Sequence, residues 1–238
     1  MIKKLSVLVW KGTPEIKEDY ICIERDYNIY INNKKISKIT ASPENLKELG
    51  VGHTIAEGYL KGVDVKDVHI EDNNIVVNTH TSNSANNETG NCERYLINKV
   101  PIKLPLSTIL NIMEDMLRDK KIWELTGGTH WACLYDLNGN KIVSIEDIGR
   151  HSAVDKVIGY GILRGINLRD KILVSSGRQP YMMVNKAMNA NIPVIISKSP
   201  SMDRGVELAR KNNLILIGFA RRGRFTVYSG HERILFNQ

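Results

Sequence analysis

The sequence predicts an α/β protein whose C-terminal part holds a mixed, largely parallel sheet, with a smaller α+β part before it. Two observations favour this fold class. Apolar strand-like runs alternate with helical runs from residue 171 to residue 219, at the spacing of βαβ units. The N-terminal part instead shows short alternating runs separated by turn residues, with a single helical run before a long polar stretch.

The first elements are predicted from alternation and turn chemistry. Two strands are expected between residues 20 and 31, followed by an Asn-Asn turn. A helix is expected to begin with Pro43 at its first position. It would run to about Leu60, with a break near Gly50 and Gly52.

Two short strands are predicted over residues 68–78, and residues 78–92 are mostly Asn, Thr, Ser and Gly before a final cysteine. This composition predicts a mobile surface loop. Ser107 then caps a helix that ends in the basic residues Lys120 and Lys121. The apolar face of that helix comprises Ile109, Leu110, Met113, Met116 and Leu117.

The C-terminal elements follow a regular order. A hairpin is predicted with strands at residues 131–135 and 141–145, because an Asp-Leu-Asn-Gly turn separates them. The elements expected after it are helix 153–163, strand 171–175, helix 181–189, strand 193–197, helix 203–212, strand 214–219 and a returning strand at 226–229.

Composition and cysteine usage limit the class of protein. The chain has 238 residues, 42% of them hydrophobic and 25% charged, which suits a globular core. No apolar run is long enough to span a bilayer, and residues 1–10 are expected to form a strand because they lack the features of a signal peptide. Three scattered cysteines offer neither a disulfide framework nor a zinc pair. We therefore expect a cytoplasmic protein with no metal of its own and no membrane partner.

Positive charge is concentrated near the C-terminus. Residues 164–238 contain 13 Lys+Arg and 4 Asp+Glu, a net +9, whereas the whole chain carries +7 and the remainder therefore −2. A solvated basic surface and a nucleic-acid face are the alternatives to a specific site. Because few aromatic residues accompany the charges, nucleic acid is not the expected partner.

Cations and hydroxyls recur where three predicted strands end. The segments are Ser-Ser-Gly-Arg at 175–178, Ser-Lys-Ser at 197–199 and Phe-Ala-Arg-Arg-Gly-Arg at 219–224. Ligands of open α/β sheets bind at such ends, helix N-termini favour anions, and arginine forks fit phosphate. The pattern therefore predicts a site for a large, multiply anionic ligand.

Other nucleotide and hydrolase templates do not fit. The sequence contains no GxxxxGK[ST] loop and no GxSxG elbow. Gly159, Gly161 and Gly165 do not have GxGxxG spacing, and the pair His69 and Glu71 is not followed by P-C-x-x-C, as a zinc deaminase would require.

Four segments together resemble one family. They are Thr-Gly-Gly-Thr-His at 126–130, Glu-Asp-Ile-Gly-Arg-His-Ser-Ala-Val-Asp-Lys at 146–156, Ser-Ser-Gly-Arg at 175–178 and Gly-Phe-Ala-Arg-Arg-Gly-Arg at 218–224. In these segments the chain resembles the FdhD family, the accessory sulfurtransferases of formate dehydrogenase. The resemblance extends over residues 126–228 and, more diffusely, over residues 43–60.

The resemblance implies a function and an assembly. Family members pass persulfide sulfur from a cysteine desulfurase to the molybdenum (or tungsten) bis(guanine dinucleotide) cofactor, which then enters formate dehydrogenase. A homodimer is implied, with a C-terminal domain similar to cytidine deaminases but without zinc. We place that domain at residues 123–238. The α+β domain, with its cysteine-bearing loop, is placed at residues 1–122.

The sulfur carrier of the family is a Cys-Gly-x-Cys motif, which here reads Thr-Gly-Asn-Cys at residues 89–92. Cys92 is therefore the expected persulfide carrier, because one thiolate can hold a sulfane sulfur. Thr89 removes the second thiol, so the alternative is a binding module that escorts the cofactor without covalent sulfur chemistry. Cys22 and Cys133 are expected to be small buried residues.

The strand ends and the resemblance together assign the residues that would hold the guanine nucleotide-type ligand. They are Ser176, Gly177, Arg178, Lys198, Phe219, Ala220, Arg221, Arg222, Gly223 and Arg224, together with His130 and His151. Either histidine can orient a ligand or exchange protons, or it can instead tie a turn to a helix. Asp147 and Arg150 are expected to have structural roles.

Overall fold

The computed structural model describes residues 1–60, 65–80, 102–118, 120–221 and 223–236. Its largest sheet has six strands in the order β13-β12-β11-β10-β8-β9. These strands are β8 (His130–Asp136), β9 (Lys141–Asp147), β10 (Lys171–Ser175), β11 (Val194–Ser197), β12 (Ile215–Arg221) and β13 (Arg224–Ser229). All six were predicted in the sequence, with bounds that differ by a few residues at most.

The six-stranded sheet is mixed, as expected, but it is not largely parallel. Only the three central strands β10, β11 and β12 run parallel to one another. Strands β8, β9 and β13 pair antiparallel with their neighbours. The short turns between β8 and β9 and between β12 and β13 make hairpins, since only a long crossover can return a strand in the parallel direction.

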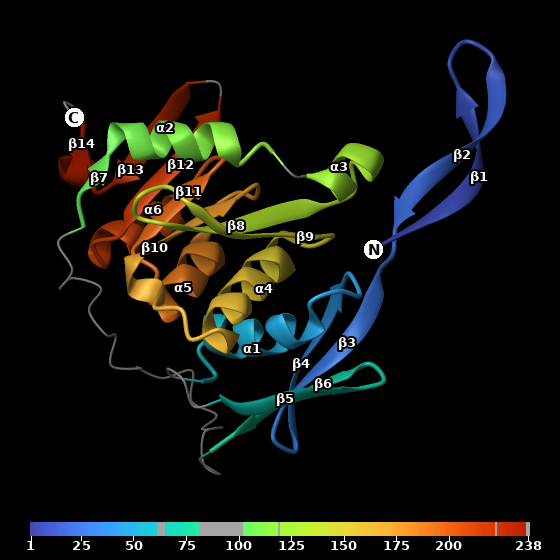
Figure 1. Cartoon of the computed structure of the whole chain (residues 1–238), viewed down its shortest axis with the longest axis horizontal. Coiled ribbons are helices and arrows are strands. Elements are labelled where there is room, and N and C mark those ends of the chain that lie inside the picture. The colour runs from blue at the N-terminus through green and yellow to red at the C-terminus, as the bar shows by residue number, and fades with distance from the viewer. Residues whose placement is uncertain (61–64, 81–101, 119, 222, 237–238) are drawn as a thin grey trace.

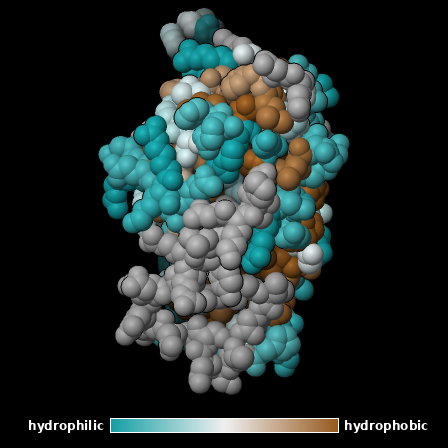
Figure 2. All heavy atoms as spheres, turned by 90° about the vertical axis from the view of Figure 1, so that its left-hand side faces the viewer, coloured by the Kyte–Doolittle hydropathy of each residue, from teal (hydrophilic) through white to brown (hydrophobic). Residues whose placement is uncertain are grey.

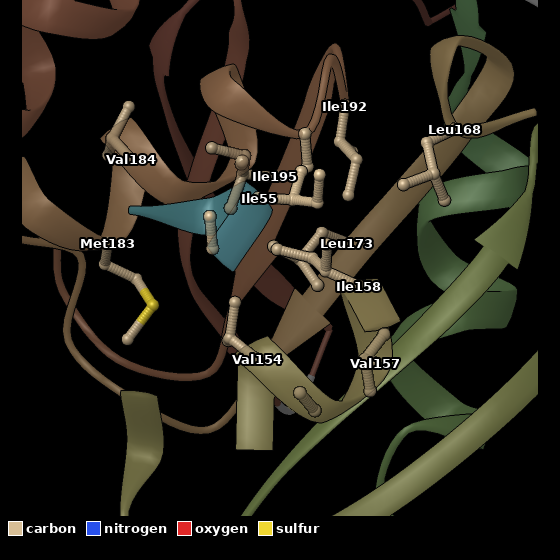
Figure 3. Close-up of a cluster of buried hydrophobic side chains, with 14 of the residues drawn as sticks. Ile55, Val154, Val157, Ile158, Leu168, Leu173, Met183, Val184, Ile192 and Ile195 are labelled. Carbon is tan, nitrogen blue, oxygen red and sulfur yellow. The ribbon is translucent and has the colours of Figure 1, made fainter. Parts of the chain in front are cut away.

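Helices cover both faces of this sheet (Figure 1). The α-helices that the structure describes are α1 (Leu46–Ala56), α2 (Leu106–Asp115), α3 (Lys121–Thr126), α4 (Arg150–Leu163), α5 (Tyr181–Asn189) and α6 (Asp203–Lys211). Side chains alternate along β8, so Ala132 and Leu134 pack towards α1 and α4, whereas Trp131 and Tyr135 pack towards α2. Figure 3 shows part of the hydrophobic core between the sheet and helices α1 and α4, where Ile55, Val154 and Ile195 lie together.

The N-terminal strands form two further sheets. Strands β3 (Arg25–Ile31), β4 (Lys34–Ala41), β5 (Val65–Glu71) and β6 (Asn74–Thr79) build a sheet in the order β4-β3-β6-β5. Strands β1 (Ile2–Trp10) and β2 (Pro14–Cys22) form a ribbon that projects from the body (Figure 1). A short parallel pair joins β7 (Leu104–Pro105) to β14 (Ile234–Leu235).

Helix α1 corrects the predicted start and the predicted break. It begins at Leu46, so Pro43 is outside it, and it continues without interruption through Gly50 and Gly52. A Cβ atom on Gly52 would lie 1.7 Å from the carbonyl oxygen of Asp155, so this glycine lets α1 and α4 approach closely. The glycines that suggested a helix break therefore serve helix packing instead.

Three other boundaries differ from expectation. Helix α2 begins at Leu106 with Pro105 as its N-cap, so Ser107 lies inside the helix instead of capping it. Helix α2 ends at Asp115, so Lys120 and Lys121 belong to the start of α3 rather than to the end of the preceding helix. Leu110 and Leu117 are exposed, although they were predicted on its apolar face. Helix α4 begins at Arg150, three residues before the predicted start, in the segment that follows β9.

Several expectations fall outside what the structure can test. Most of the predicted loop at residues 78–92, including Cys92, lies outside the described residues. The domain division after residue 122 stays a prediction. In the described part of the chain, no helix combines the length and apolar character needed to cross a membrane. The face in Figure 2 shows apolar patches among hydrophilic residues.

Candidate functional site

The three basic strand ends meet at one cavity of about 470 Å³, which we call the strand-end pocket. Its lining residues are Leu117, Lys120, Trp123, Glu124, Gly127, Gly128, Thr129, His130, Trp131, Ile148, Ser176, Lys198, Ser199, Pro200, Phe219 and Arg221. Five of the predicted binding residues are among them, one or two from each strand end and His130 from the start of β8. Residues from all three strand ends therefore line the same cavity.

The remaining predicted residues do not line the cavity. Gly177, Arg178, Ala220, Gly223, Arg224 and His151 are absent from its wall, and Arg222 is not among the described residues. Ala220, on β12, is buried in the core, and Arg178 is exposed outside the pocket. Alternation along a strand explains part of this result, because neighbours on one strand face opposite sides.

Hydroxyl groups hold the strand-end loops together. The Ser197 hydroxyl donates to the carbonyl oxygen of Gly177 at 2.6 Å, and the Ser199 hydroxyl donates to that of Ser176 at 2.7 Å. These hydroxyls were predicted to face an anion, but backbone carbonyls already occupy them. None of the described residues of α5 or α6 lines the pocket, so the helix N-termini do not supply the anion site.

Phe219 has an unusual backbone conformation at the pocket. Its φ is +52°, in the left-handed region that bulky residues rarely adopt, and the pairing of β12 with β13 shifts register between Gly218 and Arg221. The guanidinium groups of Arg221 and Arg224 each lie 5.8 Å from the centre of the Phe219 ring. Such local strain concentrates at functional sites, and here the bulge places an aromatic ring and Arg221 in the wall.

His130 connects the start of β8 to the first strand end, at Ser176. Its Nδ1 atom lies 3.1 Å from the Ser176 hydroxyl, which also accepts a hydrogen bond from the backbone N–H of Trp131. Burial lowers the pKa of His130, and the positive charges of Arg150 and Arg178 lower it further. The imidazole is therefore neutral near pH 7, and can accept or donate one hydrogen bond towards a ligand.

His151 and Asp147 do not line the pocket. Burial lowers the pKa of His151, as do the charges of Arg150 and Lys186, and its Nε2 atom has no partner among the described residues. Asp147 is fully buried and accepts hydrogen bonds from Lys156 at 2.6 Å and from the Ser42 hydroxyl at 2.7 Å. This geometry agrees with the structural role expected for Asp147.

The wall formed by α3 was not foreseen from the sequence. Glu146 accepts hydrogen bonds from the backbone N–H groups of Ile122 and Trp123 and from the Thr129 hydroxyl, so it fixes α3 over the strand ends. The Lys198 ammonium lies 5.6 Å from the centre of the Trp123 ring. Six residues of helix carry too little periodicity to be predicted, so no sequence signal pointed to Trp123.

The two described cysteines have different environments. Cys133 is fully buried on β8, as expected. Cys22 is only partly buried and lies beside the pocket, because its Sγ atom is 3.2 Å from the Thr126 hydroxyl and would be 2.9 Å from a Cβ atom on Gly128. Among the described residues, no group of three or more His, Cys, Asp or Glu side chains is arranged to hold a metal ion.

The fold and the site define a class: an α/β protein with a basic, aromatic pocket at the C-terminal ends of three parallel strands. The model of the FdhD/NarQ family matches residues 22–235, most of the chain. This chain therefore belongs to the FdhD/NarQ family, and the resemblance found in its motifs is confirmed.

Relatives match over nearly their whole length. Protein FdhD of Methanocaldococcus jannaschii is 42% identical over 230 residues, which are 96% of this chain and 97% of the relative. Sulfur carrier protein FdhD of Sulfolobus acidocaldarius is 34% identical over 249 residues, covering 98% of both chains. A crystal structure from Desulfotalea psychrophila, assigned as a formate dehydrogenase accessory protein, superposes with a TM-score of 0.83 at 26% identity, covering 98% of this chain and 99% of that one.

Proposed function

We propose that this chain is a sulfur carrier in the maturation of formate dehydrogenase. It would accept persulfide sulfur from a cysteine desulfurase and deliver it to a molybdenum or tungsten bis(guanine dinucleotide) cofactor held as cargo. Relatives of similar length are named sulfur carrier proteins, and one similar structure is assigned as a formate dehydrogenase accessory protein. The observation that carries the proposal is the convergence of three basic strand ends on one pocket.

The pocket fits one guanine nucleotide end of such a cargo. A volume of about 470 Å³ is within the usual range for small-molecule sites, which is roughly 300–1,000 Å³. Lys198 and Arg221 supply positive charge for phosphate groups. Trp123 and Phe219 offer ring faces on which a base can stack. His130 and Ser176 provide further hydrogen-bonding groups in the pocket wall.

Cys92 is proposed as the sulfur carrier. Its thiolate would attack the sulfane sulfur of the desulfurase persulfide, so that a new S–S bond forms on Cys92 and the desulfurase cysteine leaves as a thiolate. We further propose that the protein acts in the cytoplasm as a homodimer. The assignment of Cys92 is supported by the family motif at residues 89–92.

A second function is favoured by Thr89. Because threonine replaces the first cysteine of the family motif, the chain lacks the partner thiol for a relay between two cysteines. The protein would then bind and escort the cofactor without covalent sulfur chemistry. The pocket is common to both proposals, whereas the persulfide belongs only to the first.

Mass spectrometry separates the two functions. After incubation with a cysteine desulfurase and cysteine, the first proposal expects a peptide containing Cys92 that is heavier by one sulfur atom. The adduct should be absent from Cys92→Ser and retained in the control Cys22→Ser. A chain that binds guanine nucleotide but never carries the extra sulfur would support the escort function and contradict the sulfur carrier.

The pocket itself is tested with GDP as the probe. Arg221→Ala should weaken GDP binding by about tenfold, because a charge-assisted hydrogen bond contributes roughly 1.5–3 kcal/mol. The matched control is Arg204→Ala on α6, an exposed arginine outside the pocket. Equal GDP affinity of both variants in a calorimetric titration would contradict the proposed site.

A further inference from the structure

Lys120 is a buried cation whose partners in the described part of the chain are all neutral. Lys120 is only 2% exposed, although it lies at the start of the short helix α3. The ammonium donates to the Ser144 hydroxyl at 2.8 Å and to the Sγ atom of Cys133 at 3.4 Å. It also lies 4.5 Å from the centre of the Trp131 ring. Among the described residues, no carboxylate forms an ion pair with it.

The other two buried lysines show what is missing. Lys156 pairs with Asp147 at 2.6 Å, and Lys186 pairs with Asp155 at 2.7 Å. Both are almost completely inaccessible to solvent, as Lys120 is. A buried charge is expensive to maintain unless an opposite charge compensates it. Among the buried lysines that the structure describes, Lys156 and Lys186 meet this requirement, whereas Lys120 does not.

The location of Lys120 indicates that a ligand in the strand-end pocket would supply the compensating negative charge. Lys120 lines the strand-end pocket, together with Trp123 from α3 and with Lys198 and Arg221 from the strand ends. An ammonium has three donors, and two of them have protein partners. A ligand in the pocket would therefore lie against Lys120, whose ammonium the core has already desolvated and oriented. Its neighbour Lys121 is exposed and does not line the pocket.

We propose that Lys120 binds a phosphate group of the ligand in the strand-end pocket and supplies it with a buried positive charge. This inference rests on the proposed function of the pocket, but it goes further by assigning a residue that neither the strand-end pattern nor the family motifs indicated. Trp131 and Ser144 act as positioning residues, because they hold the ammonium in place while the site is empty.

The experiment compares Lys120→Met with the matched control Lys121→Met. GDP, guanosine and inorganic pyrophosphate are titrated calorimetrically into each variant and into the unmodified protein. We expect Lys120→Met to lower GDP and pyrophosphate affinity by about tenfold or more, while guanosine affinity does not change. The Lys121→Met variant should match the unmodified protein for all three probes.

A second measurement separates binding from structural support. Since Lys120 is an uncompensated buried charge, methionine in its place should leave the ligand-free melting temperature unchanged or raise it. Added GDP should then raise the melting temperature of Lys120→Met less than that of the unmodified protein. A residue that only supports the fold would show the opposite pattern: a lower melting temperature and unchanged affinity.

The outcomes distinguish this inference from the function on which it rests. If the unmodified protein binds pyrophosphate but not GDP, the guanine assignment fails, and loss of pyrophosphate binding in Lys120→Met still supports the inference. If Lys120→Met binds GDP and pyrophosphate as tightly as the unmodified protein, the inference is overturned while the proposed function survives. Absence of binding of both probes to the unmodified protein overturns both.

Discussion

At the scale of single residues, a buried ion pair holds the middle of α4 against the end of β9 and against Ser42. The Lys156 ammonium donates to Asp147 at 2.6 Å and to the carbonyl oxygen of Ser42 at 3.0 Å, and both charged side chains are fully buried. Burial lowers the pKa of Lys156, while the Asp147 charge acts in the opposite direction. The Asp147 carboxylate therefore stabilises the charged form of Lys156, which burial alone would disfavour.

Asp147→Asn should lower the free energy of unfolding by about 3–5 kcal/mol, because it leaves the Lys156 charge buried without a partner. The control is Asp170→Asn, which removes the exposed partner of Lys171 and should cost less than about 1 kcal/mol. Urea denaturation measures both values. Equal costs for the two variants would show that burial does not govern the Asp147 pair.

Two histidines make stability depend on pH. The folded-state pKa values of His130 and His151 lie below the ordinary value of 6.5, chiefly because of burial. The unfolded chain therefore takes up protons first as the pH falls, so the free energy of unfolding should decrease as the pH falls below about 6.5. Replacing both residues by glutamine should flatten this dependence, as measured by urea denaturation between about pH 7 and pH 5. An unchanged slope would contradict the assignment.

The sequence allowed some pocket residues to be predicted but not others. Lys198 and Arg221 follow predicted strands, and topology alone places strand ends of parallel neighbours together. Lys120 and Trp123 belong to a short segment whose position depends on hydrogen bonds from α3 to Glu146. Such a tertiary contact leaves no periodic pattern, which is why this wall appeared only in the structure.

At the level of elements, the contact between α1 and α4 depends on glycine. A Cβ atom on Gly52 would lie 1.7 Å from the Asp155 carbonyl oxygen, and one on Gly159 would lie 1.9 Å from that of Glu48. Neither backbone atom can move away without separating the two helices. From the sequence, these glycines could be interpreted only as weak helix formers. The sequence of one helix does not reveal how closely it packs against another.

Gly52→Ala should therefore destabilise the protein by at least about 1–3 kcal/mol, the usual cost of overpacking, despite the higher helix propensity of alanine. Lys47→Ala, an exposed change in the same helix, should alter the free energy of unfolding by less than about 0.5 kcal/mol. Thermal or urea unfolding of both variants provides the comparison. A Gly52→Ala variant as stable as the unmodified protein would mean that the helices can separate at little cost.

At the level of the whole molecule, part of the positive charge near the C-terminus lies in the strand-end pocket. Residues 164–238 carry a net +9, yet among the described cations of this region only Lys198 and Arg221 line the pocket. Many of the other basic residues are exposed, so a solvated basic surface explains the rest of the charge.

The predicted order of strands and helices was correct in the C-terminal part because its periodicity is strong. The helix boundaries differ from prediction where capping and packing determine them.

The most direct measurement for the account is a crystal structure of the protein with GDP. We expect GDP to occupy the strand-end pocket, with its phosphate groups within hydrogen-bonding distance of Lys120, Lys198 or Arg221 and its base against Trp123 or Phe219. GDP bound elsewhere on the chain, with the strand-end pocket empty at saturating concentration, would contradict it.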